Sequence, residues 1–295
     1  MMVWEIFLNH LKCSSLAFSG VLNVLLNLFF VIVLHMTVNG VATATVISNA
    51  ISSLLLFVRL RRSDKAIHLE WKELRIDRKS LQKILQIGFP AGIQSAVFSV
   101  SNIVIQSAIN SLGTVVMAAS SAAFNIEVIA YDVLSSFSQA CTTFVGQNYG
   151  AGELNRCRKT LVLCLVENTV ASGLAIMLVL CSGRFLLSLF NQDPEVISIG
   201  YTRLMVVFTA YFFSMLYEVM SGYLRGFGIL LVPALLTMLG VCGVRILWVA
   251  TAFPQHRSFQ TILLAYPLSL AATAVLIFIA LLVYHPSHKT KGEAV

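Results

Sequence analysis

The segment Thr261–Tyr284 has the sequence TILLAYPLSLAATAVLIFIALLVY and contains no charged side chain. A helix that crosses the hydrocarbon core of a bilayer needs about 20 mostly apolar residues, because that core is roughly 30 Å thick and each helical residue adds about 1.5 Å. The segment is long enough and apolar enough to meet this requirement. It therefore predicts a transmembrane helix.

The rest of the chain has the same character. Of its 295 residues, 58% are hydrophobic and only 11% are charged, whereas a soluble protein carries about 25% charged residues. Such a chain cannot cover itself in water, so its outer surface must face the lipid bilayer. The sequence predicts an all-α, polytopic bundle of about eight transmembrane helices, at 16–36, 39–60, 84–110, 115–145, 160–182, 198–224, 231–253 and 261–284.

The basic residues indicate an orientation. Nine of the twenty Lys and Arg residues lie within 59–83, and most of the others lie in loops on the same side of the predicted bundle. By the positive-inside rule this side is cytoplasmic, which places both termini in the cytoplasm and the protein in the inner (plasma) membrane. The net charge of +7 therefore suits an anionic membrane face, and we expect no nucleic-acid partner.

One long polar segment, 61–83, separates two leading hydrophobic runs from six following ones. Its acidic and basic residues are interspersed, which predicts a cytoplasmic linker that forms an amphipathic helix on the membrane surface. The chain is thus divided into residues 1–60, the linker 61–83, a six-helix lobe at 84–284 and a cytoplasmic tail at 285–295.

Two neighbouring spans carry wide polar faces at a helical spacing of 100° per residue. Because unpaired polar groups are costly in hydrocarbon, these faces must meet other helices or water. We expect them to line one shared cavity, although hydrogen bonds within a packed bundle are an alternative explanation. The candidate lining residues are Gln94, Asn102, Gln106, Tyr131 and Gln139.

Three carboxylates, Glu127, Asp132 and Glu218, fall within predicted spans. A charge at the bilayer centre costs at least about 2.5–3.5 kcal/mol, so such residues are functional candidates. A buried carboxylate can bind a proton, a sodium ion or a cationic substrate in competition. Buried ion pairs are the alternative, with Arg225 seven residues after Glu218 on the same face and Arg245 able to neutralise either glutamate.

Two further ionisable residues, Glu167 and Arg203, lie closer to the ends of their predicted helices, where long side chains can reach the membrane interface. The sequence contains no C-x-x-C pair, zinc-ligand set, nucleophile–base pair or phosphate-binding loop. We therefore expect no enzymatic activity and no metal site. The only expected cofactor is a coupling ion, H⁺ or Na⁺.

Three stretches carry a family resemblance: IGFPAGIQ at 87–94, TFVGQNYGAG at 143–152 and EVMSGYLRGFG at 218–228. In this order they resemble the second lobe of the multidrug and toxic compound extrusion (MATE) transporters. The resemblance implies a protein of two six-helix lobes that exchanges protons or sodium ions for organic cations by alternating access. It also implies that 1–60 holds the last two helices of an incomplete N-terminal lobe, so that the first four helices are absent.

The match has departures. Relatives often carry a coupling aspartate in the first helix, and some carry an acidic residue where this chain has Phe98 and Ser99. Glu127 and Glu218, by contrast, match acidic positions of some relatives. The expected function is a monomeric multidrug antiporter whose partners are the bilayer and small organic cations. A flippase for lipid-linked oligosaccharides and a transport-inactive fragment remain alternatives.

Overall fold

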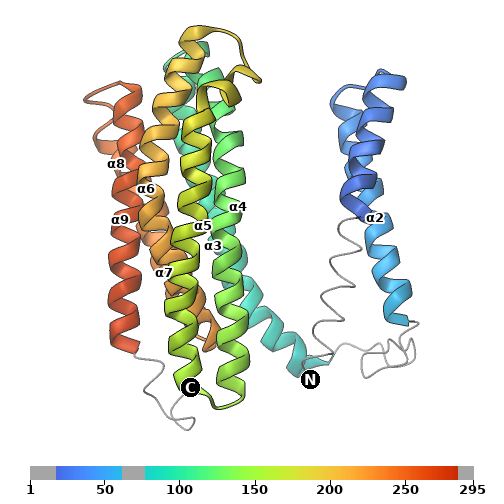
Figure 1. The fold of residues 1–295 in the computed structure, drawn as a ribbon, viewed down its shortest axis with the longest axis vertical. Coiled ribbons are helices and arrows are strands. Elements are labelled where there is room, and N and C mark those ends of the chain that lie inside the picture. Colours follow the sequence, from blue (N-terminus) through green and yellow to red (C-terminus); the bar gives the residue numbers. More distant parts are fainter. Residues whose placement is uncertain (1–17, 62–76, 285–295) are drawn as a thin grey trace. The chain divides into compact units, whose positions relative to one another are not determined.

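The computed structural model describes residues 18–61 and 77–284, and the regular structure in these ranges is entirely helical (Figure 1). Seven helices there are long and apolar enough to cross a membrane. The all-α fold expected from the sequence is thereby confirmed. The spanning helices are α2 (Val38–Arg61), α3 (Arg78–Asn110), α4 (Thr114–Gly150), α5 (Leu154–Ser188), α6 (Pro194–Gly226), the continuous helix formed by α7 (Leu231–Thr237), η3 (Met238–Gly243) and α8 (Val244–Thr251), and α9 (Phe259–Tyr284).

The chain forms two compact units, Met1–Leu81 and Gln82–Val295. In the first unit, an apolar helix runs from Phe18 to Val33 and is shorter than the seven spanning helices. It corresponds to the first expected span, 16–36, and it ends in the π-helix η1 (Phe29–Val33). His35 then turns the chain, with φ of 52°, and leads towards α2.

Small and polar side chains hold the two helices of the first unit together. Ser19 Oγ donates to the backbone carbonyl of Ser48 at 3.1 Å, and Asn23 Nδ2 donates to Ser48 Oγ at 3.1 Å. Gly40, at the start of α2, allows α2 to pack closely against the preceding turn, because a Cβ there would lie 2.8 Å from the Cβ of Met36. Such contacts replace the hydrophobic effect, which is absent between helices in lipid.

The second unit begins within α3, whose start is fixed by a capping residue. The backbone N–H and the hydroxyl of Ser80 both donate to Asp77 Oδ2, at 2.9 and 2.8 Å. These hydrogen bonds stabilise the carboxylate and lower the pKa of Asp77 below its usual value. α3 therefore begins at Arg78, several residues before the expected 84. Most of the expected linker, residues 62–76, lies outside the described residues, so its helical character stays a prediction.

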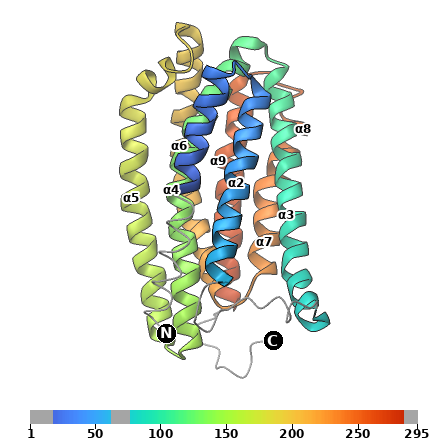
Figure 2. The same ribbon diagram turned by 90° about the vertical axis from the view of Figure 1, so that its right-hand side faces the viewer.

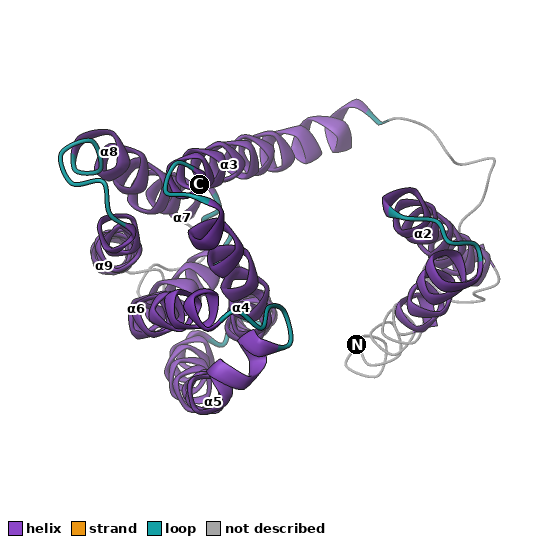
Figure 3. Ribbon diagram, turned by 90° about the horizontal axis from the view of Figure 1, so that it is seen from above, coloured by secondary structure: helices purple, strands orange, loops and turns teal. Residues whose placement is uncertain are grey.

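In the second unit, α6 packs against α4, α5 and α9 (Figures 2 and 3). Two glycines allow the backbones of α4 and α6 to approach closely. A Cβ at Gly222 would collide with the backbone oxygen of Ser138, and one at Gly226 would lie 2.6 Å from the Cβ of Val145. Thr142 Oγ1 uses this approach to donate to the carbonyl of Gly222 at 3.0 Å.

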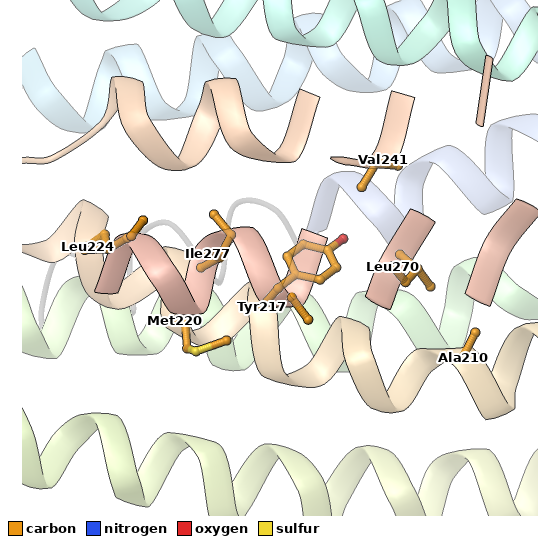
Figure 4. Close-up of a cluster of buried hydrophobic side chains, with 9 residues drawn as sticks. Ala210, Tyr217, Met220, Leu224, Val241, Leu270 and Ile277 are labelled. Atoms are coloured by element: carbon orange, nitrogen blue, oxygen red, sulfur yellow. The ribbon is translucent and has the colours of Figure 1, made fainter. Parts of the chain in front are cut away.

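An apolar cluster fills the space between α6, η3 and α9 (Figure 4). Tyr217, Leu224, Leu270 and Ile277 are each at most 5% exposed. Large apolar side chains also lie on the outer surface of the helices. On α5 they form a stripe in which each member is more than half exposed: Val162, Val166, Val170, Leu174 and Met177. A surface of this kind is suited to lipid.

Candidate functional site

A cavity of about 570 Å³ opens between α3, α4, α6 and α7 in the second unit. Its lining is mixed. Phe98 and Tyr217 contribute aromatic rings, whereas serines and amides contribute hydrogen-bonding groups. Five of the residues singled out from the sequence meet in this cavity: Gln94, Tyr131, Gln139, Glu218 and Arg225.

Glu218 is the acidic residue of this cavity. The Tyr131 hydroxyl donates to its Oε1 at 2.7 Å, while the Arg225 Nη2 lies 4.0 Å from its Oε2. The Glu218 side chain is 14% exposed and that of Arg225 is 36% exposed. One oxygen of Glu218 thus accepts a hydrogen bond from a neutral phenol, while a cation lies near the other oxygen without a direct hydrogen bond.

Ser138 links these groups, although the sequence does not single it out. Its hydroxyl donates to the backbone carbonyl of Glu218 at 2.6 Å and accepts from Arg225 Nη2 at 2.8 Å. The only sequence signal is its position on the polar face of the fourth span. Gln94 is similarly anchored, because its Nε2 donates to Thr237 Oγ1 of α7 at 2.8 Å.

We expected the polar face of α3 to line one shared cavity, but it lines two. Asn102 and Gln106 line a second cavity of about 260 Å³, which also contains Ser120, Arg203 and Tyr266. Gln94 lies two to three turns away along α3, next to α7. A single helix face can serve both cavities because α3 is 33 residues long.

Glu127 forms a buried ion pair with Arg203. Arg203 Nε donates to Oε1 at 2.7 Å and Nη2 donates to Oε2 at 2.9 Å. Both side chains are less than 5% exposed. The paired geometry occupies both carboxylate oxygens and is the strongest arrangement available to these groups. Arg203 therefore does not reach the membrane interface, contrary to the expectation from its position in the sequence.

Arg203 also donates to Ser120 Oγ at 2.7 Å and to the Tyr266 hydroxyl at 3.1 Å. The Tyr266 ring lies close to two guanidinium groups, with its centroid 5.2 Å from Cζ of Arg203 and 4.5 Å from Cζ of Arg245. Tyr266 was not predicted, since a tyrosine within an apolar span carries no single-sequence signal.

The expected role of Arg245 as a carboxylate partner is wrong for the part of the chain that the structure describes. Its Nε donates to Ser269 Oγ at 3.1 Å, and the ion pairs found among the described residues do not include it. Arg245 is 9% exposed. The partners of Arg245 are the hydroxyl of Ser269 and the ring of Tyr266, in place of the expected carboxylate.

Asp132 is exposed on α4 and lines neither cavity. Its neighbour Tyr131 reaches the larger cavity, and one residue along a helix turns the side chain by about 100°. Glu167 is likewise exposed on α5. The prediction that Asp132 belongs to the cavity is therefore corrected.

Seven helices long and apolar enough to cross a membrane, with apolar side chains on their outer faces, define a multi-pass membrane protein among the described residues. The MatE family model matches residues 90–250, more than half of the chain. The chain belongs to the MatE family, whose members are transporters and not enzymes.

The curated relatives agree with this assignment. The chain is 26% identical over 244 residues to the probable multidrug resistance protein YoeA of Bacillus subtilis, covering 81% of this chain and 52% of YoeA. It is 28% identical over 267 residues to the probable multidrug resistance protein NorM of Thermotoga maritima, covering 88% of this chain and 55% of NorM. The chain thus spans about half the length of the curated relatives it matches.

Solved structures share the fold. An outward-facing multidrug resistance MATE transporter of the MOP superfamily matches with a TM-score of 0.79 at 16% identity, over 93% of this chain and 62% of that one. A MOP superfamily transporter from Pyrococcus furiosus matches with a TM-score of 0.80 at 16% identity, over 94% of this chain and 63% of that one. At this identity, the likeness concerns the arrangement of helices.

Proposed function

We propose that this chain acts in a secondary antiporter that exports organic cations in exchange for protons or sodium ions. The observation that carries the proposal is Glu218, a carboxylate that lines a cavity of about 570 Å³. The names of relatives support it, because they include a multidrug export protein, MepA of Staphylococcus haemolyticus, besides the probable multidrug resistance proteins.

The cavity suits a cation with an apolar body. Glu218 attracts the positive charge, and the rings of Phe98, Tyr131 and Tyr217 line the same space. Aromatic faces attract cations by their quadrupole and also bury apolar surface. The amides of Gln94 and Gln139 provide hydrogen bonds without adding charge.

Exchange follows from competition at one carboxylate. A proton bound to Glu218 removes the charge that holds the organic cation, and a sodium ion satisfies the same oxygens. Cargo and coupling ion therefore leave and enter in turn. The geometry favours Glu218 over Glu127 for this role, because both oxygens of Glu127 are already occupied by Arg203.

We further propose a plasma-membrane location with both termini in the cytoplasm. The basic residues of 59–83 and 146–159 support this orientation. The turn after α6, which follows Arg225, then lies on the cytoplasmic side. In this orientation the larger cavity belongs to the cytoplasmic half of the lobe and the smaller one to the outer half.

Efflux measurements test the function. The full chain is reconstituted in liposomes, and ethidium transport is followed under a proton gradient and, separately, a sodium gradient. We expect Glu218→Gln to lower coupled transport at least about tenfold, the effect of losing roughly 1.4 kcal/mol of cation binding. Glu167→Gln is the matched control, since it removes an exposed glutamate that lines neither cavity. Equal transport by both variants would contradict the proposed role of Glu218.

A further inference from the structure

The two arginines of α6, Arg203 and Arg225, each lie beside a glutamate but at different distances. Arg203 is bound to Glu127 through two hydrogen bonds, of 2.7 and 2.9 Å, in a buried setting. Arg225 approaches Glu218 only to 4.0 Å, which is beyond hydrogen-bonding distance. Arg225 and Glu218 are thus close enough for electrostatic attraction but do not form a hydrogen bond.

The position of Arg225 on α6 explains why it lies there. Glu218 precedes it by seven residues, which is about two turns and about 10 Å along the axis. Long side chains on a helix point towards its N-terminus. The guanidinium therefore extends back along the cavity wall towards Glu218, and both residues line the same cavity.

A neutral anchor holds the guanidinium short of the carboxylate. Arg225 Nη2 donates to Ser138 Oγ at 2.8 Å. Ser138 is itself fixed, because its hydroxyl donates to the Glu218 carbonyl and its backbone oxygen touches Gly222 of α6. Arg225 thus has a defined resting position beside the acid.

We propose that Arg225 is a tethered cation that competes with cargo for Glu218. This inference rests on the proposed function, in which Glu218 binds the cargo cation. While the cavity is empty, the guanidinium screens the Oε2 side of Glu218. An entering organic cation displaces it from this position towards the cavity mouth, and its return assists release of the cargo. Arg225 thereby sets the affinity for monovalent cations without contacting them.

Binding of tetraphenylphosphonium to the full chain in nanodiscs tests this competition. We expect Arg225→Gln to tighten binding about fivefold, since a partly exposed ion pair is worth about 1 kcal/mol. Glu218→Gln is expected to weaken binding about tenfold. In the double variant, removing Arg225 no longer tightens binding, because no acid remains for which to compete.

The outcomes separate the two ideas. Unchanged binding in Glu218→Gln overturns the proposed function itself. Weaker binding in Glu218→Gln together with unchanged or weaker binding in Arg225→Gln overturns only the competition. Equal tightening by Arg225→Gln with and without Glu218 overturns it as well, because the effect then reflects the general field of a positive charge.

Two further variants control for charge and folding. Arg225→Lys keeps the charge and is expected to bind within about twofold of the parent. Arg156→Gln removes an exposed basic residue at the start of α5 and leaves binding unchanged if the effect is local. A monodisperse elution profile for each variant shows that changes in affinity are not changes in folding.

Discussion

At the scale of single residues, the surroundings of Glu127 and Glu218 assign them different tasks. Glu127 is 3% exposed and accepts hydrogen bonds from Arg203 on both oxygens, whereas Glu218 lines a cavity and lies 4.0 Å from its arginine. Replacing one member of a buried pair strands a charge, while replacing a cavity acid removes a ligand. Their variants should therefore fail in different assays.

For Glu127→Gln we expect a loss of about 3–5 kcal/mol in the free energy of unfolding, because Arg203 is left buried without a counter-charge. Denaturation of the purified chain in mixed micelles measures this loss. Glu167→Gln, at an exposed site, should unfold like the parent. Parent-like stability of Glu127→Gln would mean that the Arg203 pair contributes little.

The sequence identified the acid of the cavity but not the partners of the buried arginines. Helical spacing placed Gln94, Tyr131 and Gln139 on polar faces, and these residues do line the cavity. The partner of Glu127, however, lies 76 positions away in the chain. Spacing along one helix carries no information about which distant side chain faces it across the bundle.

At the scale of elements, the close contact of α4 and α6 depends on residues without side chains. Gly222 and Gly226 lie one turn apart on the face of α6 that touches α4. This spacing of small residues is the usual means by which membrane helices approach each other. The contact also fixes Ser138, and with it the resting place of Arg225.

Gly222→Ala is expected to destabilise the lobe by about 1–3 kcal/mol, because the new methyl group would collide with the Ser138 backbone oxygen. Unfolding in mixed micelles again provides the measurement. Gly173→Ala on α5 is the control, since nothing lies within 4 Å of the added Cβ. That variant should be unchanged or slightly more stable, because alanine is the better helix former. Equal effects of both substitutions would contradict a tight α4–α6 contact.

The first turn of α3 should depend on pH through Asp77. The pKa of Asp77 is lowered in the folded protein. Its carboxylate therefore stabilises the start of α3 fully above the unfolded pKa, near 3.8, and this stabilisation is lost as the pH falls through the folded pKa. Hydrogen exchange of residues 78–84, corrected for intrinsic rates, should quicken below about pH 3.8. Asp77→Asn should flatten this dependence, and a parent-like pH profile in that variant would contradict the capping role.

At the scale of the whole molecule, composition predicted the membrane-spanning bundle and left its internal geometry open. The absence of charge from spans such as Thr261–Tyr284 required lipid-facing helices, and seven spans are present among the described residues. The division into two cavities arises from packing between α3, α4 and α6. Such packing depends on side-chain shape across helices, which hydropathy does not report.

The proposed orientation makes a labelling prediction. Gln192→Cys, in the turn before α6, should react with an impermeant maleimide in right-side-out vesicles, because that turn faces outward in this orientation. Ala151→Cys, in the turn between α4 and α5, should react only after permeabilisation. The parent chain gives the background from the exposed Cys181. The reverse labelling pattern would invert the topology.

The π-helix η3 has a consequence for how this chain tolerates changes in length. A π-type turn holds one residue more than the α-helical turn that it replaces. Deleting one residue within Met238–Gly243 would therefore restore an ordinary turn and leave α7 and α8 facing their present neighbours. The same deletion inside α8 would rotate the residues beyond it by about 100°. Single-residue deletions in this helix should therefore be accepted at η3, where the backbone already accommodates a surplus residue.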